Sequence, residues 1–287
     1  MDKRTGVMKA GLLAVSLCGV GVFCSCGLDE MYELDAPTTT YHYSTYDTSD
    51  PLSWYCDFRT VSQDSSLQDY VRYLGTGVYY KIYNSYSALI SQRDSITSLN
   101  TTNNGSSAAT RMIQTLGFQP LGTSPNLSLS VFVEEGYGSS TRVQFRLKSQ
   151  ASADVSSDSM VSGSLAMIRS GDSYIGYDNG SQRNYAYDEA TDTWNGVDFS
   201  EVRFVIPYRY DNSHSFDFFD DNDDDDDGNR DVEPVDGDDD YYHSSSASAD
   251  GTYYVQLFAV SIARSGTYEY SYSSVLDLGA IPIIRNQ

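Results

Sequence analysis

Basic residues are scarce in this chain. Its 287 residues include 18 Lys and Arg against 40 Asp and Glu, which gives a formal net charge of −22. Proteins that bind nucleic acid neutralise rows of phosphates with clustered Lys and Arg. The composition therefore argues against nucleic acid as a partner. Separately, a length of 287 residues suffices for one large domain or two small ones.

Histidine is scarcer still, and the familiar catalytic motifs are missing. The three histidines His42, His214 and His243 are isolated from one another, and there is no HExxH, GxSxG or P-loop sequence. We therefore expect a protein that is not an enzyme. The sequence leaves one enzyme class open, because any two of its many carboxylates could converge into the pair that a glycan hydrolase requires.

Long apolar runs are also lacking near the N-terminus, where a membrane helix could be expected. Lys3, Arg4 and Lys9 precede an uncharged apolar run of 14 residues, 10–23. A helix that spans a bilayer needs about 20 such residues. A short basic region followed by a run of this length is typical of a secretory signal peptide.

The end of that run carries three of the four cysteines of the chain, Cys18, Cys24 and Cys26. A metal site would need at least a fourth ligand and usually paired spacings, and no histidine lies near residues 18–26. The stretch Phe23-Cys24-Ser25-Cys26-Gly27 instead resembles a bacterial lipobox, with an apolar residue at −3 and a small one at −1 from Cys26. Phe at −3 departs from the usual Leu.

The longer phrase "CSCGLDEMYELDAP" is similar to the mature start of spirochaete lipoproteins, which tolerate this Phe. The resemblance implies that residues 1–25 are a lipoprotein signal peptide and that Cys26 is the lipid attachment site. Two acyl chains, such as palmitate, anchor a protein stably in a membrane, whereas one binds marginally. The expected location is the cell envelope, with the protein facing the periplasm or the cell surface. An ordinary signal peptide is the alternative.

Cys56 would be the only thiol left after removal of the signal peptide and acylation of Cys26. A lone thiol cannot form an intramolecular disulfide, so no disulfide framework is expected. Cys56 follows Trp54 and Tyr55 in an apolar segment, which predicts a buried and inert side chain. A nucleophilic role would require a positioned histidine or cation.

The abundant residue types favour a mainly β protein. Tyrosine occurs 25 times and aromatics make up 13% of the chain, enough apolar surface for a core. We expect a polar tether over residues 26–50 and a single domain over residues 51–287. Strands are predicted around residues 52–61, 75–85, 127–133, 142–148, 201–210, 251–264 and 267–279. Residues 165–180 are predicted to form a hairpin that turns near Ser170, Gly171 and Asp172. The segment 142–148 is the clearest half-buried strand, because Val143, Phe145 and Leu147 alternate with polar residues.

A change of apolar period predicts an inserted pair of short helices at about residues 84–116. Tyr86, Leu89 and Ile96 recur at helical spacing, although Arg93 interrupts the apolar stripe. Gly117 is a suitable stop for the second helix. Residues 100–107 are expected to form the loop between them.

Repeated short strands with one apolar face predict an antiparallel β-sandwich. The phrases "VYYKIYNS" and "YYVQLFAV" resemble the third and sixth strands of a fibronectin type III domain, of the immunoglobulin-like class, and "SSV" near Ser274 would suit its last strand. The two phrases lie much further apart than in a domain of about 100 residues. The helical pair and the other intervening segments would be insertions, and the resemblance implies an architecture without a function.

The chain also contains a long acidic run, residues 217–240. Residues 217–240 contain fourteen acids and one arginine, and we expect a disordered acidic loop over about residues 211–250. Asp223, Asp225, Asp227 and Gly228 match the first half of a calcium-binding EF-hand loop. The position of the bidentate glutamate is occupied by Pro234, so these three aspartates are weak calcium candidates, and no other cofactor is expected.

The sequence thus favours a lipid-anchored envelope lipoprotein. Its β-sandwich would be a structural or binding module for an unknown protein or glycan. A glycan-acting enzyme of the envelope and a calcium-modulated adhesin are the alternatives.

Overall fold

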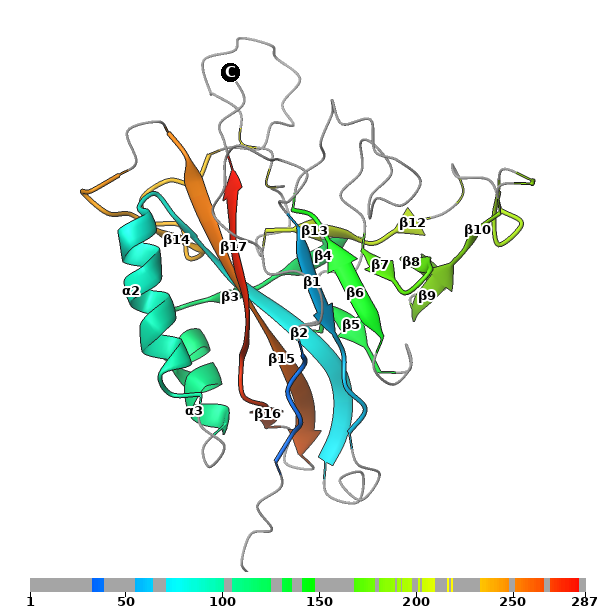
Figure 1. The fold of residues 1–287 in the computed structure, drawn as a ribbon, viewed down its shortest axis with the longest axis horizontal. Helices are drawn as coiled ribbons and strands as arrows, with labels where there is room; N and C mark the ends of the chain where they lie inside the picture. Colours follow the sequence, from blue (N-terminus) through cyan, green and yellow to red (C-terminus); the bar gives the residue numbers. More distant parts are fainter. Residues whose placement is uncertain are drawn as a thin grey trace, which may run out of the picture. The chain divides into compact units, whose positions relative to one another are not determined.

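The chain divides into two compact units, Met1–Glu33 and Leu34–Gln287, and the elements described below belong to the second. The computed structural model describes residues 33–38, 55–63, 71–100, 105–124, 131–135, 141–147, 168–178, 181–188, 190–191, 193–197, 201, 203–209, 216, 218, 233–247, 251–265 and 269–283. Its strands form two larger sheets, which are antiparallel except for one short pair (Figure 1). The expected mainly β, antiparallel architecture is confirmed.

The larger sheet is built on two long strands, β2 (Val71–Tyr83) and β15 (Tyr253–Ser265), which pair over almost their whole length. On the other side of β15 lie β16 (Tyr270–Tyr272) and β17 (Leu276–Ile283). Three short strands pair with β2: β3 (Gln119–Pro120), β5 (Val133–Glu134) and β14 (Tyr241–Tyr242). The β14–β2 pair is parallel.

The second sheet contains six shorter strands, all antiparallel. They are β1 (Cys56–Arg59), β6 (Arg142–Phe145), β7 (Arg169–Ser170), β8 (Ser173–Asp178), β9 (Ser181–Tyr185) and β12 (Arg203–Phe204). The tight turn from β7 to β8 passes through Gly171 at φ +60°, which confirms the hairpin predicted there.

Two small pairs complete the β structure: β4 (Gly122–Ser124) with β13 (Ile206–Tyr208), and β10 (Tyr187–Asp188) with β11 (Thr193–Trp194). The predicted strand 201–210 is therefore interrupted. Its first part, β12, joins the second sheet, and its second part, β13, contains Pro207 and pairs with β4.

Side chains that alternate along β2 and β15 separate two cores. One set packs against the second sheet and fills the interior of the sandwich, together with Phe58 and Phe145. Its members on the long strands are Val78, Tyr80, Ile82, Val255, Leu257 and Ala259. The alternate set faces the helices and includes Tyr79, Tyr83, Tyr254, Phe258, Val260 and Ile262. Both faces of the long strands are thus buried, which explains their aromatic and β-branched composition.

The predicted helical pair covers the outer face of the larger sheet (Figure 1). It consists of α2 (Tyr86–Thr97) and α3 (Gly105–Thr110), which continues as a π-helical turn, η4 (Arg111–Thr115). Gly117 follows η4 at φ +68°, as expected for a helix stop. The helix begins at Gly105, so the predicted loop 100–107 is too long by about one turn.

The strand predicted at 142–148 is present as β6, but two polar side chains of the predicted span are buried. Gln144 and Arg146 have only 7% and 5% of their surface exposed. Gln144 donates to the Asp57 carboxylate, and Arg146 lies over the Tyr55 ring at 5.6 Å. Alternation of residue types predicted the strand correctly, but it could not reveal polar partners on the neighbouring strand.

The folded unit begins earlier than the sequence predicts, inside the expected tether of residues 26–50. Leu34 is buried, Thr38 and Arg59 exchange backbone hydrogen bonds, and Asp35 accepts from Ser261 through its carbonyl oxygen. We call residues Leu34–Thr38 the N-terminal strap. The strap contacts β1 of one sheet and β15 of the other, so it closes the sandwich between the two.

The two strands that resemble a fibronectin type III domain are direct neighbours. β2 contains "VYYKIY", β15 contains "YYVQLFAV", and β17 pairs with the opposite side of β15. In an immunoglobulin-like sandwich the third, sixth and seventh strands also share a sheet. This agreement concerns the arrangement of strands, and membership of that family stays a prediction.

A bulge in β2 gives the first testable prediction. Gly75 has φ +137°, and an added Cβ would lie 2.1 Å from the carbonyl oxygen of Val133 in β5. Gly75→Ala should therefore lower the free energy of unfolding by more than about 3 kcal/mol, through strain and overpacking. Gly171→Ala, at φ +60° with no atom within 4 Å, should cost only about 1–2 kcal/mol. Urea denaturation measures both, and equal losses would contradict the bulge geometry.

Candidate functional site

A buried ion-pair cluster fixes the C-terminal end of the acidic run to the sandwich. The Arg209 guanidinium, 3% exposed, donates to both carboxylate oxygens of Asp240 at 2.8 and 2.7 Å and to Asp238 at 3.0 Å. The Tyr80 hydroxyl donates to the same Asp240 carboxylate at 2.5 Å. A bidentate, charge-assisted pair of this kind defines both the position and the orientation of its partners.

The electrostatics of the cluster favour the charged state of Arg209. Burial alone would lower the pKa of the guanidinium, but hydrogen bonds and charge from Asp240 outweigh it, with smaller contributions from Tyr80 and Asp238. The pKa of Arg209 is therefore raised, and the side chain stays cationic. Because both oxygens of the Asp240 carboxylate accept from Arg209, the cluster is suited to holding a segment in place.

Backbone contacts extend this attachment along residues 233–247. The amide of Ile82 donates to the Asp240 carbonyl at 2.8 Å, and β14 then pairs with the end of β2. The Asn84 side chain hydrogen-bonds both the amide and the carbonyl of Ser244, at 2.8 and 3.0 Å. The folded structure thus reaches well into the predicted loop of residues 211–250. We call residues 233–247 the acidic root.

A row of tyrosines crosses the sheet next to the acidic root. Tyr242, Tyr83 and Tyr254 are aligned in register on β14, β2 and β15, and Tyr86 packs on Tyr254 with 5.5 Å between ring centroids. Tyr83 and Tyr254 are buried and pack within the fold, whereas Tyr86 and Tyr242 are 37% and 39% exposed. The exposed rings offer surfaces for stacking against a sugar or an aromatic side chain.

Lys81 lies beside this row, with its ammonium 6.0 Å from the centre of the Tyr242 ring. Burial lowers its pKa, and the charge of Asp240 partly offsets that shift. The ammonium donates to the carbonyl of Leu116, which follows η4. A cation at the end of a helical segment compensates the partial negative charge of its free carbonyls. This contact gives Lys81 a structural role.

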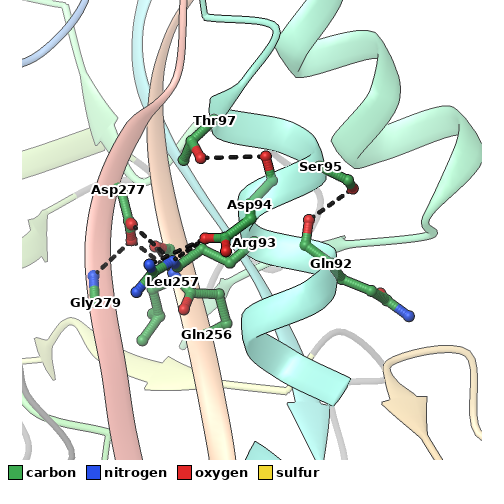
Figure 2. Close-up of polar contacts among 9 residues, drawn as sticks. All are labelled: Gln92, Arg93, Asp94, Ser95, Thr97, Gln256, Leu257, Asp277 and Gly279. Atoms are coloured by element: carbon green, nitrogen blue, oxygen red, sulfur yellow. Dashed lines mark hydrogen bonds and ion pairs between the residues drawn. The ribbon is translucent and has the colours of Figure 1, made fainter. Parts of the chain in front are cut away.

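A second polar cluster joins α2 to the larger sheet (Figure 2). The Asp277 carboxylate accepts from the Gln256 side-chain amide at 2.7 Å and from the Gly279 backbone amide at 2.9 Å. Arg93 approaches the same carboxylate at 3.7 Å and also pairs with Asp94. The arginine that interrupts the apolar stripe of α2 is thus explained: it reaches the irregular β15–β17 pairing near Leu257.

A third carboxylate, that of the buried Asp57 on β1, pairs with Arg142 on β6 at 2.6 Å. Asp57, Asp240 and Asp277 each lie within 4 Å of an arginine side chain. These arrangements are those of structural carboxylates.

Most of the residues singled out in the sequence lie outside the described part of the chain: Cys26, Asp223, Asp225, Asp227, His42 and His214. His243 is exposed beside the Tyr241 ring. Within the described ranges no group of three His, Cys, Asp or Glu side chains could hold a metal ion. The same ranges contain no helix that is long and apolar enough to cross a membrane.

Cys56 is completely buried, as predicted, and its thiol points to the Leu278 carbonyl at 3.9 Å. Burial raises its pKa well above the ordinary value, and the charges of Asp277 and Asp57 add to the shift. A thiol in these surroundings is protonated and therefore a poor nucleophile.

The sequence did not reveal the Arg209 cluster. One signal was available, because Arg209 is a lone base that follows an apolar strand and precedes the acidic run. Its partner could not be chosen among fourteen acids without the structure. In comparisons with protein-family models, curated proteins and solved structures, nothing matched this chain.

The Arg209 cluster predicts a large effect on stability. Arg209→Met should lower the free energy of unfolding by about 3–5 kcal/mol, because it leaves the Asp240 charge buried without its cation. Arg183→Met is a matched control, since Arg183 pairs with Asp178 at 2.7 Å but both side chains are about half exposed. We expect the control to lose less than about 1 kcal/mol in urea denaturation. A small loss in both variants would contradict the structural role of the cluster.

The complete burial of Cys56 predicts that its thiol reacts only when the protein unfolds. In a chain with Cys18→Ser, Cys24→Ser and Cys26→Ser, Cys56 is the only thiol. It should not react with a thiol reagent at pH 8 while the protein is folded, and it should react once urea unfolds the protein. An added thiol at the exposed site Val235→Cys should react at once.

The raised pKa of Cys56 also makes the free energy of unfolding depend on pH. The stabilising contribution of Cys56 is complete below about pH 9.0, the ordinary thiol value, and is lost as the pH rises from there towards the folded-state pKa. Denaturation of Cys56→Ala at several pH values tests the sign. The stability difference from the parent should narrow above pH 9.0, and a widening difference would refute the assignment.

Proposed function

We propose that this chain is a lipid-anchored protein of a bacterial cell envelope and that its β-sandwich serves as a structural or binding module. The observation that carries the proposal is the lipobox-like stretch Phe23-Cys24-Ser25-Cys26-Gly27 at the end of a basic and then apolar segment. Acyl chains on Cys26 would bind the membrane, and the folded unit would act outside it.

The attachment of the N-terminal strap to both sheets also supports this proposal. Leu34 lies eight positions after Cys26, and from there the chain is attached to both sheets. Gln63 reinforces the attachment, because its side chain accepts from the Asp35 amide and donates to the Asp35 carbonyl. An anchored chain needs a firm junction of this kind, since the junction carries every force between the membrane and the domain.

The acidic root and its exposed tyrosines are the best candidate for the binding surface of the module. They combine a high negative charge with two partly exposed aromatic rings, Tyr86 and Tyr242. Surfaces that present tyrosine beside polar groups suit protein or glycan ligands. The partner proposed here is accordingly a protein or a glycan in the envelope or outside the cell.

Labelling with radioactive palmitate and the mass of the mature N-terminus test the anchor. The wild-type chain should incorporate label and begin with a modified Cys26. Cys26→Ser should abolish the label, and Cys24→Ser should retain it, because Cys24 leaves with the signal peptide in this scheme. An unmodified mature chain that begins at another residue would refute the proposal.

A further inference from the structure

Two partly exposed tyrosines stand at the ends of a continuous row of rings. Tyr242 on β14 is paired with Tyr83 on β2, and Tyr83 is paired with Tyr254 on β15. Residues that face one another across paired strands project from the same side of the sheet. Tyr86, the first residue of α2, completes the row, because its ring lies 5.5 Å from that of Tyr254. We call these four residues the tyrosine row.

The ends of the tyrosine row are exposed and its middle is buried. Tyr83 contacts the Tyr242 ring at 5.8 Å, and its hydroxyl donates to the Gln92 side chain at 2.9 Å. Tyr242 and Tyr254 lie two strands apart, which is about 10 Å at a strand spacing of about 4.8 Å. The exposed rings are thus held on a packed support, at a separation comparable with the length of a short oligosaccharide.

The segments that carry the row have no charged side chains. Residues 84–92 and 241–247 contain no Asp, Glu, Lys or Arg, although charged residues make up 20% of the chain. We call them the uncharged segments. Besides the two tyrosines they expose several hydroxyl groups, those of Ser87, Ser91, Ser245 and Ser246. Aromatic rings beside neutral hydrogen-bonding groups suit a ligand that has apolar faces and hydroxyl groups.

The charges near the row disfavour an anionic ligand. Lys81 is 8% exposed and donates to a helical carbonyl, and Asp240 is 6% exposed and is bound by Arg209. The exposed Asp236 and Asp239 of the acidic root precede β14. An acidic polymer would be repelled by these carboxylates, and the uncharged segments offer it no base.

The small extent of the exposed apolar surface favours a glycan over a protein. A stable protein interface buries about 800 Å² on each partner, around an apolar centre. On the uncharged segments the exposed large apolar side chains are Tyr86 and Tyr242, and serines surround them in the sequence. A glycan needs less area, because one sugar ring can pack on each tyrosine while its hydroxyls bond to the serines.

We propose that the tyrosine row binds an uncharged glycan, with one sugar ring packed on Tyr86 and another on Tyr242. This inference rests on the proposed role of the sandwich as a binding module, and it names the class of ligand. The acidic root then acts as a filter, since its charge repels acidic glycans from the rings beside it.

Isothermal titration calorimetry tests the ligand class. The acylated full chain is kept in a phosphocholine detergent, which has no sugar headgroup, and is titrated with neutral hexasaccharides. The probes are maltohexaose, cellohexaose, xylohexaose, mannohexaose and the hexamer of N-acetylglucosamine. At least one of them should bind, whereas the acidic hexamer of galacturonate should not. A chain that binds none of the neutral probes, or that binds only the acidic one, overturns the proposal.

Single substitutions locate the site. Tyr86→Ala and Tyr242→Ala should each raise the Kd about fivefold or more, and Tyr86→Phe and Tyr242→Phe, which keep the ring, should change it by less than about twofold. Tyr270→Ala is the matched control, because Tyr270 is 49% exposed on β16, which pairs with the other end of β15. Circular dichroism confirms that each variant is folded. An unchanged Kd in both alanine variants would show that the glycan binds elsewhere and would refute the site.

A hexaarginine peptide separates a glycan site from a protein site, because arginine stacks on tyrosine and is attracted to acidic groups. If the tyrosines bind this peptide and no hexasaccharide, the binding module stands and the glycan assignment is refuted. If the chain binds neither, both the binding surface and its ligand class are refuted. Palmitate labelling of the same preparation then decides separately whether the anchor stands.

Discussion

The pairing of β2 with β15 is the constraint on which the rest of the structure depends. Two strands of thirteen residues each meet along nearly their full length, and every shorter strand of the larger sheet pairs with one of them. Their register assigns one set of side chains to the sandwich interior and the other to the helices. A slip by one residue would exchange the two sets, so the register specifies both cores at once.

Three buried or partly buried carboxylates in the described part of this acidic chain are each placed next to an arginine. Asp57, Asp240 and Asp277 lie inside or at the margin of the packed layers, and each is close to one of the few arginines. Each pair joins segments that are distant in the sequence. Loss of one partner leaves an uncompensated charge, so these contacts contribute specificity for one arrangement as well as energy.

The sequence predicted the long strands, the helical pair, the hairpin at Gly171 and the burial of Cys56, because local periodicity and turn chemistry determine these features. It did not predict the partners of Gln144, Arg93 or Arg209, since pairing between distant strands sets them. The strap escaped prediction for a related reason. Leu34 lies in a short stretch where acidic and apolar residues mix without a clear period, and the strap that carries it is attached to both sheets.

The strap also determines how the domain would respond to mechanical load. Tension on the N-terminal side of the chain reaches β1 through the Thr38–Arg59 backbone pair and β15 through the bond from Ser261 to Asp35. The load is therefore divided between both sheets at the point of entry. Tension of this kind draws the two layers in the same direction, whereas a chain attached to one sheet alone would peel that sheet from the other.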